Sequence, residues 1–229
     1  MSAWPGLVIF DCDGVLVDSE ALALGCARRA FSELGVELSA ERARDLFLGL
    51  SQPAMRATTR ARLGLELPEG FESSLTRLTV EAFERELKGV EGLREALEEL
   101  DIPVCVASSS PPERIRASLN IVGYADLFPG AVFSASEVAR GKPAPDLFLH
   151  AAGRLGIAPA ECLVIEDSAP GVEAALRAGM VAFGFTGGAH AAGERYRERL
   201  REAGARTIFD DMRELPVLIE TVRQALQHG

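Results

Sequence analysis

Short apolar runs, most of which do not alternate with polar residues, recur along this chain of 229 residues. A strand that is apolar on both faces must be covered on both faces, which is typical of a parallel sheet. Helical patterns separate the runs, and the short links predict right-handed crossovers and a doubly wound α/β sheet. The expected strands are Leu7–Phe10, Pro103–Ala107, Ala131–Phe133, Cys162–Ile165 and Val181–Phe185, with a shorter sixth at Ala205–Ile208.

The helices expected around this sheet follow from apolar spacing and from start and stop residues. In Ser110-Pro111-Pro112-Glu113, a serine cap, prolines in the first turn and an early glutamate predict a helix start. Gly179 marks the end of another helix. The expected helices are Leu93–Leu100, one that begins at Ser110, Asp146–Leu155, Ser168–Ala178 and Leu215–Leu226.

Residues 19–88 break the alternation of strands and helices, because their pattern is helical throughout. A block of this length is too long for a simple crossover between two strands. We therefore expect an all-helical cap domain, residues 18–88, inserted into an α/β core formed by residues 1–17 and 89–229. The two links near Val17–Asp18 and Lys88–Gly92 form a plausible hinge. The expected cap helices are Glu20–Leu34, Ala40–Leu48, Gln52–Leu63 and Phe71–Leu87.

The formal net charge of −10 argues against nucleic acid as the main partner, because phosphate backbones favour a basic face. The charge is uneven. Residues 19–88 hold 10 Lys and Arg and 11 Asp and Glu, a net −1, and the remaining −9 lies elsewhere. An anionic small molecule therefore meets a weaker repulsive field over that stretch.

The sequence favours neither a membrane protein nor a secreted one. No apolar run approaches the ~18 residues of a membrane helix, and Met1–Gly6 lacks the basic and apolar parts of a signal peptide. Cys12, Cys26, Cys105 and Cys162 show no paired spacing, as free thiols of a cytosolic protein do. We expect a cytoplasmic monomer.

Charged and hydroxyl side chains follow three of the expected strands and occupy one loop. Because parallel strands end at a common edge, these side chains should meet there. Four carboxylates so close together repel each other, and a divalent cation removes that repulsion. Carboxylate ligands without a His or Cys pattern favour Mg²⁺, which commonly bridges to phosphate. The residues are Asp11, Asp13, Ser108, Lys142, Glu166 and Asp167.

Four segments together resemble the motifs of the haloacid dehalogenase (HAD) superfamily, in the order of that family. They are Asp11-Cys12-Asp13-Gly14-Val15-Leu16-Val17-Asp18-Ser19-Glu20, Ala107-Ser108-Ser109-Ser110, Gly141-Lys142-Pro143-Ala144-Pro145-Asp146, and the stretch 164–172. The resemblance covers essentially the whole chain, including the helical cap. It is greatest to the branch of sugar-phosphate phosphatases and β-phosphoglucomutases.

The resemblance implies a catalytic role for two aspartates. Asp11 would be the nucleophile that attacks phosphorus and forms an aspartyl-phosphate. Asp13 would be the general acid for the leaving oxygen and then the general base for water, while its backbone carbonyl binds the metal.

The resemblance implies binding roles for the remaining motif residues. Ser108 and the Ser109 N–H would hold the phosphoryl oxygens, and Lys142 would pair with both the phosphoryl group and the nucleophile. Asp167 would bind Mg²⁺ directly, and Glu166 directly or through water. The implied activity is hydrolysis of a small phosphomonoester, such as a sugar phosphate.

Two alternatives stay open. A mutase of the β-phosphoglucomutase type shares this apparatus, although Ala21–Leu24 and Gly49–Gln52 depart from the His and Arg that mutase sequences carry in those places. A metabolite sensor on the same fold would need no catalysis. Dehalogenase chemistry does not need the acid/base that Asp13 supplies. Phosphonate hydrolysis needs a lysine in the cap, and Lys88, the lysine of residues 18–88, stands at the hinge. Both activities are therefore disfavoured.

Several polar residues near these motifs have simpler interpretations. Asp18 and Ser19 are expected to cap the first cap helix, with Glu20 in its first turn. His190 follows the fifth expected strand, where it could lie on the rim of the site, but we favour its interpretation as an ordinary loop residue. The arginine groups at 56–62 and 195–199 are most simply solvated helix faces.

Overall fold

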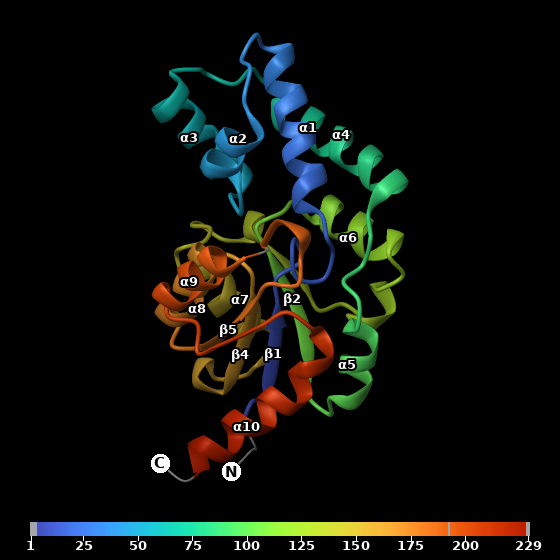
Figure 1. Cartoon of the computed structure of the whole chain (residues 1–229), viewed down its shortest axis with the longest axis vertical. Helices are drawn as coiled ribbons and strands as arrows, with labels where there is room; N and C mark the ends of the chain where they lie inside the picture. Colours follow the sequence, from blue (N-terminus) through green and yellow to red (C-terminus); the bar gives the residue numbers. More distant parts are fainter. Residues whose placement is uncertain (1–3, 192, 228–229) are drawn as a thin grey trace.

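The computed structural model describes residues 4–191 and 193–227. Its centre is a sheet of six parallel strands in the order β3-β2-β1-β4-β5-β6, and Figure 1 labels β2, β1, β4 and β5. The predicted doubly wound α/β fold is confirmed. The strands are β1 Leu7–Phe10, β2 Val104–Ser108, β3 Val132–Ser134, β4 Cys162–Glu166, β5 Val181–Phe185 and β6 Thr207–Phe209.

Helices cover both faces of the sheet, which explains why its strands do not alternate. Within β1, Phe10 belongs to an apolar cluster with α5 (Leu93–Glu99), α6 (Pro112–Ile121) and α10 (Leu215–Gln227). Its neighbour Ile9 belongs to the opposite cluster. That cluster includes residues of α7 Asp146–Leu155, α8 Ala169–Arg177 and α9 Glu194–Glu202. Short 3₁₀ turns lie at Ala125–Leu127, Ala135–Glu137, Pro159–Glu161, Ala189–Ala191 and Met212–Glu214.

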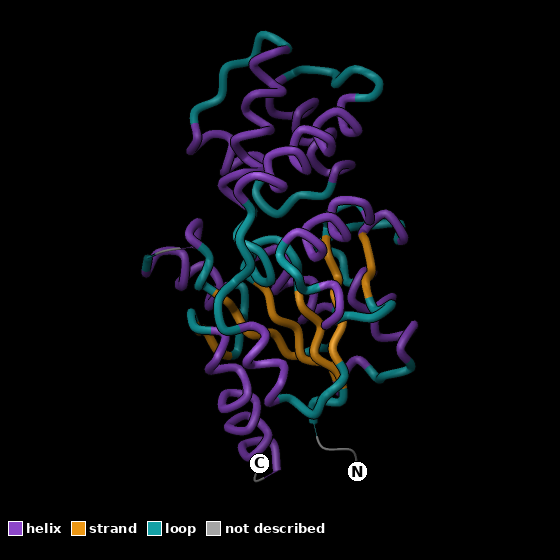
Figure 2. The backbone as a smooth tube through the Cα atoms, turned by 90° about the vertical axis from the view of Figure 1, so that its right-hand side faces the viewer, coloured by secondary structure: helices purple, strands orange, loops and turns teal. Residues whose placement is uncertain are grey.

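Of the five helices between β1 and β2, the first four gather beyond the carboxyl edge of the sheet, as Figure 2 shows. They have an apolar cluster of their own, in which Phe31 stacks on Phe47 with ring centroids 4.9 Å apart and also contacts Phe71. The helices begin where the sequence predicts, and three of them end one residue earlier. They are α1 Glu20–Glu33, α2 Ala40–Phe47, α3 Gln52–Leu63 and α4 Phe71–Glu86.

The two links between these helices and the rest of the chain run side by side. Val17 pairs with Gly89 in an isolated antiparallel bridge, and the Asp18 N–H donates to the Lys88 carbonyl at 3.0 Å. A Cβ on Gly89 would lie 2.6 Å from the Tyr124 hydroxyl oxygen, so a larger residue there would collide with the Tyr124 side chain. The paired links therefore fix where the helical block attaches.

Within the described ranges, no helix combines the length and the apolar character needed to cross a bilayer. Cys12, Cys105 and Cys162 are buried as free thiols, and Cys26 is a partly exposed one.

Candidate active site

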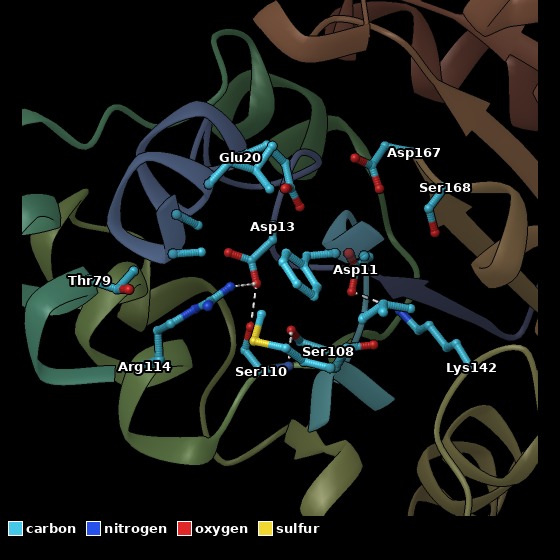
Figure 3. Close-up of a pocket in the computed structure, with 18 of the residues that line it drawn as sticks. Asp11, Asp13, Glu20, Thr79, Ser108, Ser110, Arg114, Lys142, Asp167 and Ser168 are labelled. Carbon is cyan, nitrogen blue, oxygen red and sulfur yellow. Dashed lines mark hydrogen bonds and ion pairs between the residues drawn. The ribbon is translucent and has the colours of Figure 1, made fainter. Parts of the chain in front are cut away.

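A pocket lies where the ends of β1, β2 and β4 face the helices of residues 18–88 (Figure 3). It encloses about 630 Å³ of empty space, part of which is open to solvent. Glu166 lies behind its wall and is fully buried. The structure thus brings all of the sequence-predicted site residues to one place. Those that line the pocket itself are Asp11, Asp13, Ser108, Ser109, Lys142 and Asp167.

Lys142 joins two of the predicted carboxylates. Its Nζ lies 2.8 Å from Asp11 Oδ1 and 2.5 Å from Glu166 Oε1, and its side chain is 2% exposed. Burial alone would lower the pKa of Lys142, but the Asp11 and Glu166 carboxylates outweigh that effect and raise it. Lys142 is therefore a permanent cation that holds Asp11 in place.

Asp11, Glu166 and Asp167 form an acidic cluster. Each offers an oxygen within 4.8 Å of the other two. Burial, and then the surrounding carboxylates, raise the pKa of Asp11 well above its usual value, with Lys142 offsetting part of the effect. Burial and Glu166 do the same for the pKa of Asp167. Buried oxygen ligands that destabilise one another's charge fit a hard divalent cation such as Mg²⁺.

Asp13 faces a different set of partners. Its carboxylate accepts hydrogen bonds from the hydroxyls of Ser19 at 2.6 Å and Ser110 at 2.5 Å, and lies 2.8 Å from an Arg114 nitrogen. Burial would raise the pKa of Asp13, but Arg114 and the two hydroxyls outweigh it and lower the pKa. These three donors therefore favour the ionised form of Asp13.

These hydrogen bonds correct two predictions about caps. Ser110 is not the cap of α6, because Pro111 occupies that position and the Ser110 hydroxyl donates to Asp13. Ser19 does stand at the N-cap of α1, but its side chain makes no capping bond and also turns to Asp13. A carboxylate buried beside both hydroxyls is the stronger acceptor.

Ser108 and Ser109 lie at the end of β2, where a phosphoryl group could meet them. Ser108 is fully buried, and its hydroxyl oxygen accepts the Ser110 N–H at 3.1 Å. Both serines line the pocket beside Lys142. The turn after β2 therefore presents small polar groups directly opposite Asp11 (Figure 3).

Two pocket residues escaped sequence reasoning. Arg114 projects from the first turn of α6, directly after the second motif, and pairs with Asp13. Glu20 lies in the first turn of α1 as predicted, but it is 7% exposed and lines the pocket. Burial, and then Asp167 and Asp13, raise the pKa of Glu20 to about 8. The available signal was their position, since Glu20 ends the first motif and Arg114 follows the second.

His190 is not an ordinary loop residue, so that interpretation is wrong. Its side chain is 2% exposed, its Nε2 lies 2.7 Å from Asp167 Oδ2, and its ring contacts the Tyr196 ring edge-on. Burial lowers the pKa of His190, which favours the neutral ring. The loop after β5 thus packs an imidazole against the acidic cluster.

Gly171 leaves the space that the Glu166 carboxyl group occupies. A Cβ at this position would lie 1.9–2.2 Å from the Glu166 carboxyl atoms. Glu166 cannot move aside easily, because Lys142 holds one of its oxygens and Ser168 holds the other. We expect Gly171→Ala to cost about 1–3 kcal/mol of unfolding free energy through overpacking, and to lower activity by displacing Lys142. Urea unfolding and steady-state kinetics measure the two effects.

The matched control is Gly153→Ala in α7. A Cβ there meets no atom within 4 Å, so the change should stabilise the protein by about 0.5–1 kcal/mol, as a helical Gly→Ala replacement does. Equal stability changes for the two variants would contradict the role given to Gly171.

Comparisons with known proteins agree with this geometry. A family profile for haloacid dehalogenase-like hydrolases matches residues 5–179. The 6-phosphogluconate phosphatase of Escherichia coli K12 is 30% identical over 184 residues, which are 80% of this chain and 83% of that protein. The phosphorylated carbohydrates phosphatase of Thermotoga maritima is 32% identical over 179 residues, 76% of this chain and 81% of that protein.

A solved structure agrees as well. The crystal structure of a conserved haloacid dehalogenase-like protein from Agrobacterium tumefaciens is 35% identical, with a TM-score of 0.78 over 95% of this chain and 98% of that one. All four sequence motifs, from Asp11 to Val172, lie within the residues that the family profile matches. The resemblance is confirmed, and the chain belongs to the haloacid dehalogenase-like hydrolase family.

Proposed function

We propose that this protein is a magnesium-dependent phosphatase that hydrolyses a small phosphomonoester, in particular a sugar phosphate, through an aspartyl-phosphate at Asp11. The observation that carries the proposal is the buried Asp11 carboxylate, held 2.8 Å from Lys142 within an acidic cluster. The names of the two bacterial relatives, which act on 6-phosphogluconate and on phosphorylated carbohydrates, support the substrate class.

Asp11 is the nucleophile in this proposal. Asp11, Glu166 and Asp167, together with the Asp13 backbone carbonyl, would hold Mg²⁺. The ion would supply positive charge, so that a carboxylate could approach an anionic phosphoryl group. Asp11 attacks phosphorus, the bond from phosphorus to the ester oxygen breaks, and the phosphoryl group stays on Asp11.

The phosphoryl group needs its own binding groups during this transfer. Lys142 pairs with its oxygens as well as with Asp11, and Ser108 and the Ser109 N–H hold the others. The short turn after β2 places both serines beside Lys142 in the pocket, which supports this role.

Asp13 carries out the proton transfers in this proposal. It gives one to the departing alcohol oxygen, and then removes one from the water that attacks the aspartyl-phosphate, so that its protonation state is restored. The three donors around its carboxylate favour the ionised form, which suits the second step. Ser19, Ser110 and Arg114 are positioning residues for this group.

The domain division remains part of the proposal. Residues 1–17 and 89–229 form the catalytic core, and residues 18–88 form a cap whose closure excludes water from the pocket. We also propose that the protein works as a monomer in the cytoplasm.

Removal of divalent metal tests the proposal. Phosphate release from a generic aryl phosphate should fall to background after chelation and return when Mg²⁺ is added, because the three clustered carboxylates otherwise repel the substrate. Undiminished release from metal-free protein would overturn it. Conversion of a sugar 1-phosphate to a 6-phosphate without phosphate release would instead identify a mutase. Binding without turnover across phosphorylated metabolites would identify a sensor.

A further inference from the structure

The wall of the pocket that faces Asp11 from the cap helices is largely apolar. It is formed mainly by Leu24, Phe47, Leu50, Met55 and Leu75. The Thr79 hydroxyl also lies there, but it donates to the Leu75 carbonyl at 2.8 Å and is already engaged. This wall therefore offers a substrate a surface for carbon atoms and few hydrogen-bonding groups.

Glu20, from α1, is the acidic residue that the cap helices contribute to the lining of the pocket. It lines the pocket and is 7% exposed, and Figure 3 shows its carboxyl group on the same side as Asp167 and Asp13. Among residues 4–191 and 193–227, no group forms a hydrogen bond or ion pair with that carboxyl. Its oxygens are therefore free to accept a hydrogen bond from a donor on a ligand that enters the pocket.

The charge around the pocket is negative on balance. The acidic residues that line it are Asp11, Asp13, Glu20 and Asp167, and the basic ones are Arg114 and Lys142. Both basic side chains already pair with carboxylates. The charges of a divalent cation and of a phosphoryl dianion cancel. The rest of the substrate therefore meets a pocket in which carboxylates outnumber basic side chains.

We propose that the alcohol part of the substrate carries no negative charge, presents a hydroxyl or ammonium donor to Glu20, and lays its carbon skeleton against the apolar wall. This inference rests on the proposed phosphatase function and narrows its substrate class. Sugar alcohol and aldose phosphates fit this description. Sugar-acid phosphates and bisphosphates do not, so we expect this chain to differ in substrate from the relative named for 6-phosphogluconate. A second anionic group would lie near Glu20 without a free cation in the lining to pair with it.

Matched substrates test the proposal. Glucitol 6-phosphate and 6-phosphogluconate differ at one end, where the first has a hydroxymethyl group and the second a carboxylate. The 4-hydroxymethyl, 4-aminomethyl and 4-carboxy derivatives of benzyl phosphate make the same comparison on one leaving alcohol. In each set, kcat/KM should be about tenfold or more lower for the carboxylate than for the donor-bearing compounds.

Variants of residues in the cap that line the pocket show whether charge causes the difference in kcat/KM between the carboxylate and the donor-bearing substrates. Leu50 lies in the loop between α2 and α3, lines the pocket, and is outside the apolar cluster of the cap. Leu50→Lys should raise the kcat/KM ratio of the carboxylate to the hydroxymethyl compound, whereas the uncharged control Leu50→Gln should leave that ratio unchanged. Glu20→Gln should also raise the ratio when it is measured above pH 8, where Glu20 is ionised and the substitution removes a negative charge.

The outcomes separate this inference from the proposed function. Equal or faster turnover of the carboxylates, in a reaction that Asp11→Asn abolishes, would overturn the inference and leave the phosphatase proposal standing. An unchanged ratio in both Leu50→Lys and Glu20→Gln would also overturn it. Absence of turnover for every phosphomonoester would overturn the phosphatase proposal, and the inference with it.

Discussion

Asp11→Asn should reduce phosphate release by about 10⁴-fold or more on every substrate while the protein stays folded. The amide has nearly the shape of the carboxylate but cannot attack phosphorus to form an acyl phosphate. Burial and the neighbouring carboxylates raise the pKa of Asp11 above its value in an unfolded chain, so ionised Asp11 costs folding free energy as the pH rises. The neutral variant escapes that cost, and its thermal unfolding temperature should not fall.

The measurement pairs steady-state phosphate release with thermal unfolding. Acid quenching of the wild-type reaction, followed by peptide mass analysis, should find one phosphoryl group on the peptide that contains Asp11. A suitable control is Asp101→Asn, because Asp101 is an exposed carboxylate just before β2, at the opposite edge of the sheet. A variant at Asp11 with wild-type turnover, or a phosphoryl group trapped on another residue, would refute the assignment of the nucleophile.

Sequence reasoning predicted the architecture because burial dictates the apolar pattern. A strand such as Cys162–Glu166 is buried at every position, and no other fold class uses so many short strands of that kind. Helix ends were less certain. The segment from Ser110 to Glu113 has the residues of a helix start, yet the helix begins at Pro112 because a tertiary contact takes the serine side chain.

The candidate site was predicted in part for a similar reason. Residues that directly follow parallel strands meet at the carboxyl edge of the sheet, however the rest of the chain packs. Asp11 and Asp167 could therefore be placed together from the sequence. Arg114 and Glu20 reach the same pocket from helices, and His190 reaches Asp167 from a loop. The directions of these side chains depend on how those elements pack. No local pattern encodes that packing, which links positions as far apart as 13 and 114.

Asp13→Asn should slow the hydrolysis of alkyl phosphates by about 10²–10⁴-fold, the usual contribution of a general acid or base. It should slow the first step on an aryl phosphate much less. An alkoxide is a poor leaving group and needs the proton that Asp13 supplies, whereas a nitrophenoxide departs without one. In the second step, the variant should hydrolyse the aspartyl-phosphate slowly, because no carboxylate at position 13 removes a proton from water.

Rapid-quench kinetics separate these two steps. With p-nitrophenyl phosphate, Asp13→Asn should release a burst of nitrophenol close to one equivalent per site and then turn over slowly. The control Ser110→Ala removes one of the three donors to the Asp13 carboxylate but leaves the carboxylate itself, so its effect on alkyl phosphates should be much smaller. Equal losses on alkyl and aryl substrates, without a burst, would mean that Asp13 orients the site and moves no proton, since proton transfer is the one role whose importance depends on the leaving group.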